Sequence, residues 1–214
     1  MNTTRIAELL QPFLTPAALS SGQLQHISIY IDLLLRWNAR INLTAIRQEE
    51  EIVTRHFGES LFAANHLFPQ GRPGSAETLI DVGSGPGFPG LPIKIWAPEI
   101  HLTLIESNQK KATFLREIAR AITLTDINIF PDRAETYPNP PADVVTLRAV
   151  EHFETTLPIA AGLVAPGGRL ALLIGEAQLA RTQALTPRFK WAPPVQVPLS
   201  SSRVLTIGLQ QNAR

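Results

Sequence analysis

A glycine-rich turn is the part of the sequence whose residue types and spacing point most clearly to chemistry. Residues 79–90 read LIDVGSGPGFPG, an apolar run that enters a glycine loop and continues into a predicted helix. In an open α/β sheet, ligands bind beyond the carboxyl ends of the strands, where glycine lets the backbone approach them closely. Glu106 ends the next apolar run and is placed for the hydroxyl pair of a ribose. The pattern predicts a nucleoside-containing ligand; the simple alternative is a tight turn without a ligand.

Two ligand classes fit this loop. Its glycines also satisfy the GxGxxG pattern of dinucleotide-binding proteins, through Gly85, Gly87 and Gly90. Glu106 follows at about the 20-residue distance of that pattern, so a nicotinamide-dependent oxidoreductase is one alternative. Asp81, however, places a carboxylate before the loop, which is unfavourable beside a pyrophosphate and favourable beside the ammonium and sulfonium charges of S-adenosylmethionine. Pro86 and Pro89 remove backbone N–H groups that would hold phosphate. We therefore favour S-adenosylmethionine as the ligand.

Further candidate ligand contacts lie at the ends of later strands. Ala134 and Glu135 follow the third predicted strand, where a main-chain N–H and a carboxylate could read an adenine edge. Arg148 follows the fourth predicted strand and faces the methyl-donor side. The alternatives are a solvated loop acid for Glu135 and a structural ion pair, for example with Glu151, for Arg148.

The elements that must position these residues alternate between short apolar runs and helical stretches. Strands are predicted at residues 78–82, 102–105, 126–130, 143–147 and 169–174. A helix is predicted at residues 109–122, and residues 195–199 and 203–209 form a predicted closing hairpin. Alternating strands and helices of this length imply a parallel sheet with right-handed crossovers. We expect a Rossmann-like α/β fold with a mostly parallel, seven-stranded sheet flanked by helices.

The first part of the chain reads as helical. Thr15 and Pro16 predict an N-cap followed by proline at the first helical position, and Ser20 with Gln23 predicts a capping box. A second helix is predicted at residues 48–67. We expect an N-terminal helical cap that forms the substrate region (residues 1–72) and a cofactor-binding core (residues 73–214).

Composition limits the remaining classes. The chain of 214 residues has no cysteine, which excludes disulfides, thiolate metal sites and thiol nucleophiles. Its histidines show no metal-like spacing, and no apolar stretch suits a signal peptide or a membrane span. We expect a cytoplasmic protein without a bound metal. Because the net charge is only +1, a nucleic-acid partner must be argued from local clusters.

Several motifs, taken in order, resemble one family. They are WNARINLTAI (37–46), RHF (55–57), SL (60–61), DVGSGPGFPG (81–90), ES (106–107) with KK (110–111), RAE (133–135) and LRAV (147–150). Over residues 35–168 the chain resembles the 16S ribosomal RNA guanine-N7 methyltransferase family, also called glucose-inhibited division protein B. The resemblance implies a class I methyltransferase that transfers methyl from S-adenosylmethionine to N7 of a guanine in small-subunit ribosomal RNA.

The resemblance also implies site residues. Family members bind the cofactor through positions that match Gly83, Gly85, Phe88, Ala134, Glu135 and Arg148. Guanine N7 has a lone pair and no proton, so no general base is needed and positioning supplies most of the acceleration. No catalytic residue is therefore assigned, and the candidates for positioning the guanine are Arg148, His56 and Asn42, with Thr44 and Arg55 beside them. Asn42 and Thr44 could instead be turn or cap residues, and His56 could be structural.

Contacts to RNA are expected from basic side chains. The main candidates are Arg40, Arg55, Lys110 and Lys111. Arg55 could instead pair with Glu59 one helical turn later. Lysines that the family commonly has near Ile174 and near the C-terminal strand are missing, which removes positive charge from the expected RNA surface. The expected partner is 16S RNA or the small-subunit particle, bound by a monomer, and a non-catalytic S-adenosylmethionine- or RNA-binding relative is the third alternative.

Overall fold

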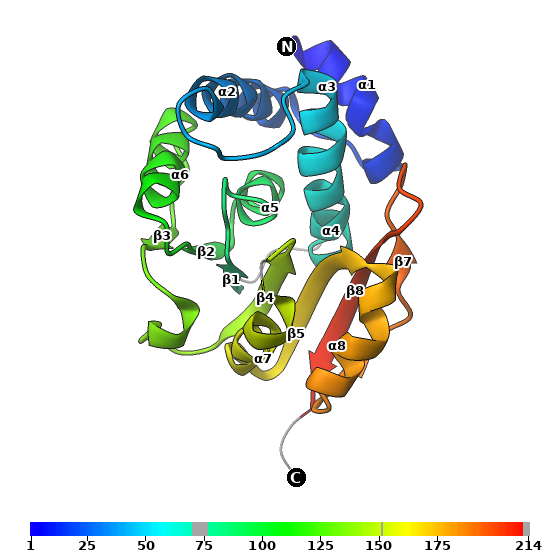
Figure 1. Cartoon of the computed structure of the whole chain (residues 1–214). Coiled ribbons are helices and arrows are strands. Elements are labelled where there is room, and N and C mark those ends of the chain that lie inside the picture. Colours follow the sequence, from blue (N-terminus) through cyan, green and yellow to red (C-terminus); the bar gives the residue numbers. More distant parts are fainter. Residues whose placement is uncertain (70–76, 151, 212–214) are drawn as a thin grey trace.

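The fold is a twisted, mostly parallel sheet with helices on both faces (Figure 1). The computed structural model describes residues 1–69, 77–150 and 152–211. The helices are α1 (Thr3–Leu14), α2 (Ser21–Asn38), α3 (Glu49–Glu51), η1 (Ile52–Gly58), α4 (Glu59–Leu67), α5 (Gly90–Trp96), α6 (Gln109–Ala121), η2 (Ala134–Thr136), α7 (Phe153–Gly162), η3 (Glu176–Gln178) and α8 (Leu179–Leu185). The strands are β1 (Thr78–Val82), β2 (His101–Ile105), β3 (Ile127–Phe130), β4 (Ala142–Arg148), β5 (Val164–Gly175), β6 (Phe189–Trp191), β7 (Val195–Gln196) and β8 (Arg203–Gln210).

The strand order confirms the predicted α/β fold. The order is β3-β2-β1-β4-β5-β8-β6, and β7 pairs with β8. Strands β1 to β5 pair in parallel, whereas β8 runs antiparallel to β5. The sheet has eight strands where we expected seven, because β6 adds to the predicted β7–β8 hairpin. A strand of three residues is too short to show a periodic pattern. The order reverses between β1 and β4, where an open α/β sheet binds its ligand.

Alternating side chains of the strands divide between two hydrophobic clusters. Leu79 of β1 and Leu102 of β2 lie in the cluster that α5, α6 and the N-terminal helices cover. Ile80 and Val145 lie in the opposite cluster, together with Leu157 of α7. In Figure 1, α2 and α6 lie on one side of the sheet and α7 and α8 on the other. The two layers fix the direction in which the carboxyl ends of β1, β2 and β4 point.

The N-terminal helices confirm one predicted cap and correct another. Ser20 and Gln23 form the predicted capping box: the Gln23 N–H donates to Ser20 Oγ (3.3 Å), and the Ser20 N–H donates to Gln23 Oε1 (2.8 Å). Thr15 does not begin a helix as predicted, because it ends α1, a helix that the sequence analysis did not anticipate. Helices α1, α2 and α4 share a hydrophobic cluster with α5 and α6. The division at residue 72 falls outside the described residues and stays a prediction.

The predicted helix at residues 48–67 contains a wider turn. The helix continues without interruption from α3 through the π-helical segment η1 to α4. π-Helical turns are rare and are frequent at functional sites. Two of the predicted site residues, Arg55 and His56, lie in this widened turn.

Candidate functional site

The glycine loop is held open by contacts with the end of β2. The N–H groups of Gly83 and Ser84 both donate to the Ile105 carbonyl oxygen (3.0 Å each), and the Gly85 N–H donates to Glu106 Oε2 (2.8 Å). Gly85 has a φ of +56°, and a Cβ built on it would meet only the Gly83 carbonyl oxygen, at 3.9 Å. The loop therefore curves around open space, which is the arrangement that a closely approaching ligand requires.

Glu106 supports this loop in addition to its predicted role toward a ribose. Its second oxygen accepts from the Asn108 N–H (2.8 Å), and the side chain is nearly buried. Asn108 in turn caps α6 by accepting from the Lys110 N–H (3.0 Å). The contact between Glu106 and a ribose stays a prediction, because these bonds show only that the carboxylate fixes the loop relative to α6.

Asp81 lies below the loop and is fully buried. One oxygen accepts from Thr146 Oγ1 (2.7 Å) and the other from the Gly90 N–H (3.2 Å). Burial raises its pKa to about 6, and this net value already includes the smaller opposing effects of the hydrogen bonds from Thr146 and Gly90 and of the charge of Arg148. The contacts that the structure gives Asp81 join β1, β4 and α5, and its predicted contact with a cofactor stays a prediction.

A pocket of about 400 Å³ lies beyond the ends of β1, β2 and β3. Three residues predicted for cofactor binding line it, namely Gly83, Ala134 and Glu135. Ser107 and His152 also line it, and the sequence analysis did not single them out for this role. The volume lies within the ~300–1,000 Å³ range of small-molecule sites. The residues present suit an adenosine group, because the pocket combines apolar walls, main-chain groups and a carboxylate.

Three stacked rings connect the glycine loop to the N-terminal helices. The Phe88 ring stacks on Tyr30 (centroids 5.4 Å apart) and on His56 (4.7 Å). Tyr30 also donates its hydroxyl hydrogen to the Pro86 carbonyl oxygen. Gly87 has a φ of +99°, and a Cβ there would overlap the Tyr30 hydroxyl and Leu91. Phe88, a predicted cofactor residue, thus packs its ring into this stack.

A cluster of arginines surrounds one buried carboxylate beside the loop. Glu59, whose side chain is 2% exposed, accepts from Arg55 Nε (3.1 Å), from Arg148 Nη2 (2.9 Å) and from Arg203 Nη1 (3.3 Å). We call these four residues the arginine cluster. The predicted pair of Arg55 with Glu59 is confirmed, and Arg148 pairs with the same glutamate; Glu151 lies outside the described residues. Three guanidinium groups share one carboxylate here, so the cluster favours an anionic ligand.

Arg148 organises the cluster from inside. Its side chain is 7% exposed, and its nitrogens donate to Glu59, to the Arg55 carbonyl oxygen (2.7 Å) and to His56 Nδ1 (3.2 Å). Arginine has no acceptor, so Nδ1 of His56 must accept and Nε2 carries the proton, which it donates to Thr44 Oγ1 (2.8 Å). Burial, together with the positive charges of Arg148, Arg55 and Arg203, lowers the pKa of His56 to about 3. His56 is therefore neutral at pH 7.

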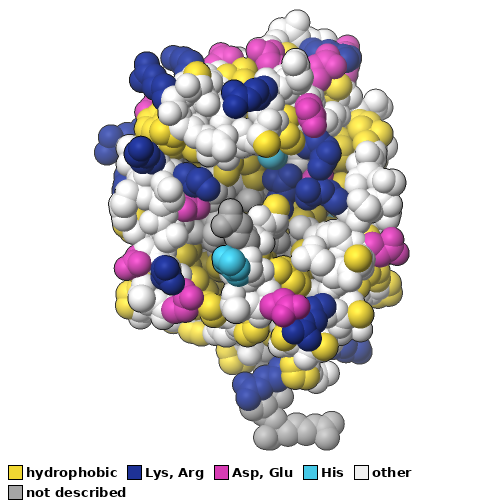
Figure 2. Space-filling view, in the orientation of Figure 1, with side chains coloured by type: hydrophobic (Ala, Val, Ile, Leu, Met, Phe, Trp, Pro, Cys, Tyr) yellow, Lys and Arg dark blue, Asp and Glu magenta, His cyan; other side chains and the backbone are white. Residues whose placement is uncertain are grey.

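The two outer arginines of the cluster reach solvent. The side chains of Arg55 and Arg203 are 44% and 28% exposed, whereas Arg148 is enclosed. Figure 2 shows dark-blue side chains gathered beside the hollow at the centre of this face, in the area where Figure 1 places the ends of β4 and α4. Sequence reasoning did not select Arg203, because no local pattern connects it with Arg55 or Arg148.

The remaining predicted residues lie around this face without joining the cluster. Asn42 and Arg40 are exposed in the turn after α2. The side chain of Asn38 holds this turn by accepting a hydrogen bond from the Leu43 N–H (2.8 Å). Lys110 is exposed and Lys111 half-buried in the first turn of α6. Their predicted roles toward RNA or guanine stay predictions.

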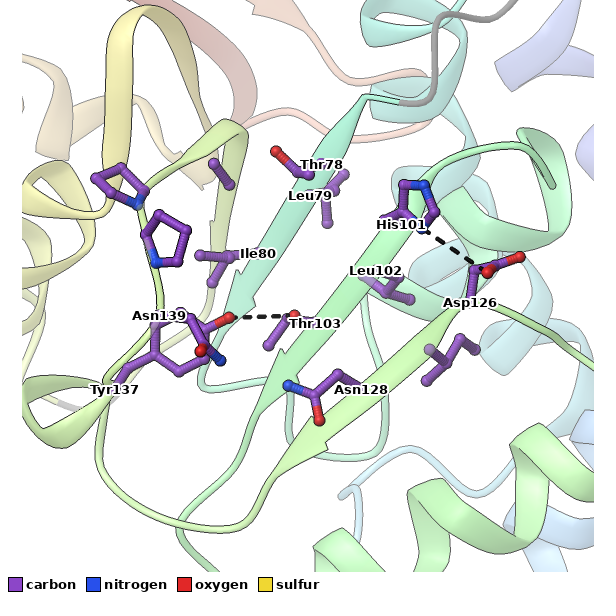
Figure 3. Close-up of a pocket in the computed structure, with 14 residues that line it drawn as sticks. Thr78, Leu79, Ile80, His101, Leu102, Thr103, Asp126, Asn128, Tyr137 and Asn139 are labelled. Carbon is purple, nitrogen blue, oxygen red and sulfur yellow. Dashed lines mark hydrogen bonds and ion pairs between the residues drawn. The ribbon is translucent and has the colours of Figure 1, made fainter.

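Another pocket, of about 380 Å³, lies toward the opposite ends of β1 to β3 (Figure 3). An ion pair between His101 and Asp126 (3.8 Å) lies at one side, and Tyr137 donates to Thr103 Oγ1 (3.4 Å) at the other. The pocket exists because only the three-residue helix η2 lies between β3 and β4, so this part of the sheet has no long helix over it. Its position near Thr78 and His101, the first residues of β1 and β2, separates it from the glycine loop.

The described residues contain neither a cluster of metal-ligating side chains nor a helix that could span a membrane. No group of three or more His, Cys, Asp or Glu side chains is arranged to hold a metal ion within residues 1–69, 77–150 and 152–211. In the same residues, every helix is too short or too polar to cross a membrane.

Comparison with known proteins identifies one family. Residues 23–200 match the family model described as rRNA small subunit methyltransferase G. The chain is 38% identical over 201 residues to the ribosomal RNA small subunit methyltransferase G of Roseiflexus castenholzii, covering 88% of this chain and 84% of the relative. It is 37% identical over 182 residues to that of Xanthomonas campestris pv. campestris, covering 83% and 82%.

Comparison with solved structures agrees on the fold. The ribosomal protein L11 methylase from Lactobacillus delbrueckii subsp. bulgaricus superimposes with a TM-score of 0.60 and 11% identity, covering 74% of this chain and 79% of that one. The similarity supports a class I methyltransferase fold. None of these similar proteins supports the oxidoreductase alternative.

Proposed function

Because the chain belongs to the rRNA small subunit methyltransferase G family, we propose that it transfers a methyl group from S-adenosylmethionine to N7 of a guanine in small-subunit ribosomal RNA. The enzyme class and the RNA substrate follow from the family. The choice of N7 rests on the motifs quoted above and on the chemistry of the site. The single observation that carries the proposal is the arginine cluster beside a nucleoside-sized pocket at the switch point of the sheet.

The cofactor contacts are part of the proposal. Gly83, Ala134 and Glu135 line the pocket that suits adenosine, and Gly85 borders the open space next to it. The N–H of Ala134 and the carboxylate of Glu135 would read the adenine, while Glu106 would accept a hydrogen bond from a ribose hydroxyl through a remaining lone pair of its carboxylate. S-adenosylmethionine supplies an electrophilic methyl group on a positively charged sulfur.

The side chains of the site support a mechanism by positioning. Both oxygens of Asp81 accept hydrogen bonds within the protein, and both ring nitrogens of His56 are engaged. Neither group is poised to remove a proton from a substrate. Guanine N7 needs no such group, because its lone pair attacks directly, and holding N7 in line with the methyl group supplies most of the acceleration. Arg148 contributes by fixing His56, Glu59 and the Arg55 backbone in one arrangement.

Exposed basic side chains around the glycine loop would make the contacts with RNA. Arg55 and Arg203 have partly exposed guanidinium groups. Arg40, Lys110 and Lys111 would add positive charge around the same face. Arginine binds phosphate through two parallel N–H groups, which suits a backbone contact. We also propose a cytoplasmic site of action, since the substrate is ribosomal RNA, and a monomer that works without a metal ion.

Two assays test the proposal. Calorimetric titration with S-adenosylmethionine, with NADH in parallel, should show binding of the former alone. Transfer of labelled methyl should then reach small-subunit RNA or particles and spare large-subunit RNA. Binding without transfer to any form of small-subunit RNA would favour the non-catalytic alternative, and binding of NADH alone would overturn the cofactor assignment.

A further inference from the structure

We call the pocket of about 400 Å³ that Gly83, Ala134 and Glu135 line the adenosine pocket. A third hollow lies on the other side of the β4 end from it. It has a volume of about 390 Å³, and its lining includes Val150, Phe153, Gly175, Gln178, Ser202 and Arg203. Val150 separates the two spaces: a Cβ built on Gly83, which lines the adenosine pocket, would lie 3.1 Å from Val150 Cγ1. A group held at this boundary is therefore within reach of both spaces. We call this hollow the β4–β5 pocket.

The chemistry of the β4–β5 pocket suits a flat, heteroaromatic group. The partly buried side chains of Val150 and Phe153 contribute apolar and aromatic atoms to its lining. The side chain of Gln178 supplies polar atoms, of which Oε1 accepts from the Gly175 N–H (3.0 Å). A nucleobase displaced from its stack is held in this way, by aromatic or apolar surfaces and a few polar edges.

Arg203 gives this pocket a charge at its edge. It is the first residue of β8, it pairs in register with Gly175 at the end of β5, and it belongs to the arginine cluster through Glu59. Among the contacts of the described residues, its side chain donates only to Glu59, at 3.3 Å, and it is 28% exposed. The remaining guanidinium N–H groups are thus available at the pocket edge. A nucleotide offers a base and a phosphate, which match the pocket and its arginine.

We propose that the β4–β5 pocket receives the displaced target guanine, with its face against Phe153, and that Arg203 holds the phosphate of the same nucleotide. This inference rests on the proposed function and specifies where its substrate enters. Arg203 then acts as a positioning residue, because it touches the nucleotide away from the atom that is methylated. The shared boundary at Val150 places the guanine next to the cofactor pocket without requiring the two to occupy the same space.

Gly175 allows the pocket to be filled selectively. A Cβ built on it would lie 3.6 Å from Gln178 Oε1 and 3.9 Å from the Ser202 carbonyl oxygen, both ordinary contacts with residues that line the pocket. Its φ of −72° is open to any residue. Gly175→Leu should therefore extend a side chain into the β4–β5 pocket without straining the backbone. Gly162→Leu is the matched control, since a Cβ at this exposed glycine meets nothing within 4 Å.

The experiment measures three quantities on the full chain: methyl transfer to small-subunit particles, affinity for S-adenosylmethionine and the thermal midpoint. We expect Gly175→Leu to reduce transfer about a hundred-fold, the size of effect that misplacement of a substrate produces, with the other two quantities unchanged. Gly175→Ala should reduce transfer less. Arg203→Gln should raise the KM for the particle more than it lowers kcat, whereas Arg181→Gln, which removes an exposed pair with Glu154, should not.

Each other outcome has a definite meaning. Full transfer by Gly175→Leu would overturn the pocket assignment. Loss of S-adenosylmethionine binding in a folded Gly175→Leu variant would also overturn it, because the pocket would then belong to the cofactor. If Gly175→Leu unfolds, Arg203→Gln decides, and an unchanged KM for the particle would contradict the proposal. Absence of transfer by the unmodified chain would instead count against the proposed function itself.

Discussion

The adenosine pocket and the arginine cluster lie on the same face of the protein and are built in opposite ways. The pocket depends on backbone shape: glycines with positive φ, main-chain N–H groups and open space beside Gly85. The cluster depends on side-chain charge, with three arginines around the buried Glu59. The first arrangement suits a ligand with a neutral nucleoside end, and the second suits a polyanion. The comparison predicts that changes in one region leave binding at the other largely intact.

The most severe test of the cluster removes its shared acid. Glu59→Ala leaves three arginines without their common carboxylate, and breaking a buried ion pair costs about 3–5 kcal/mol. We expect that loss in the free energy of unfolding, measured by urea titration. Glu154→Ala, which breaks the exposed pair with Arg181, is the control and should have a far smaller effect. Equal losses in the two variants would show that the cluster does not depend on Glu59.

A substitution in the loop should break the other region. Gly85→Asp forces a side chain onto a backbone with φ of +56° and fills the space beside the loop, where it also faces the carboxylate of Glu106. We expect S-adenosylmethionine affinity to fall at least about a hundred-fold, in line with backbone strain and charge repulsion acting together. Calorimetry measures this, with Gly22→Ala on the exposed start of α2 as control. Unchanged affinity would refute the placement of the cofactor.

Arg55→Ala should separate RNA contact from cofactor binding. Its side chain is 44% exposed and contributes charge at the outside of the cluster. We expect binding to small-subunit RNA to weaken about ten-fold and its salt dependence to fall by about one unit of slope, as for the loss of one phosphate contact. Affinity for S-adenosylmethionine should stay within error. Loss of both affinities would mean that Arg55 supports the structure of both regions.

The two regions should also respond to acid with opposite signs. Burial of His56 lowers its pKa from 6.5 to about 3, so its contribution to stability is complete above 6.5 and is lost as the pH falls toward 3. Burial of Asp81 raises its pKa from 3.8 to about 6, so its contribution is complete below 3.8 and is lost as the pH rises through 6. Between about pH 4 and pH 6 the two effects oppose each other, each with a slope of at most about 1.4 kcal/mol per pH unit.

Urea unfolding at several pH values separates these contributions. His56→Gln should leave a chain whose stability rises more, or falls less, than that of the unmodified chain as the pH drops from about 6 to 4. Asp81→Asn should have the reverse effect on the slope. If both variants keep the slope of the unmodified chain, the assigned titrations are wrong.

The same contrast explains what the sequence could predict. The loop, β1 and the acid after β2 are contiguous or fall at regular intervals, so residues 78–106 could be interpreted from spacing alone. The cluster joins residues 55, 59, 148 and 203, and only the pair of Arg55 with Glu59 has a local helical spacing. Arg203 acquires its place through the pairing of β8 with β5, which the sequence does not encode locally. The prediction that Thr15 begins a helix is wrong because an N-cap threonine and a C-cap threonine before proline look alike in sequence.

Identification of the methylated atom is the most direct test of the proposed activity. Small ribosomal subunits that lack the modification are incubated with the protein and S-adenosylmethionine labelled in its methyl group, and the RNA is then digested to nucleosides. We expect the label to elute with 7-methylguanosine and Gly85→Asp to abolish it. Label in any other nucleoside would contradict methylation at N7, and the absence of label from all RNA would contradict the proposed enzyme activity.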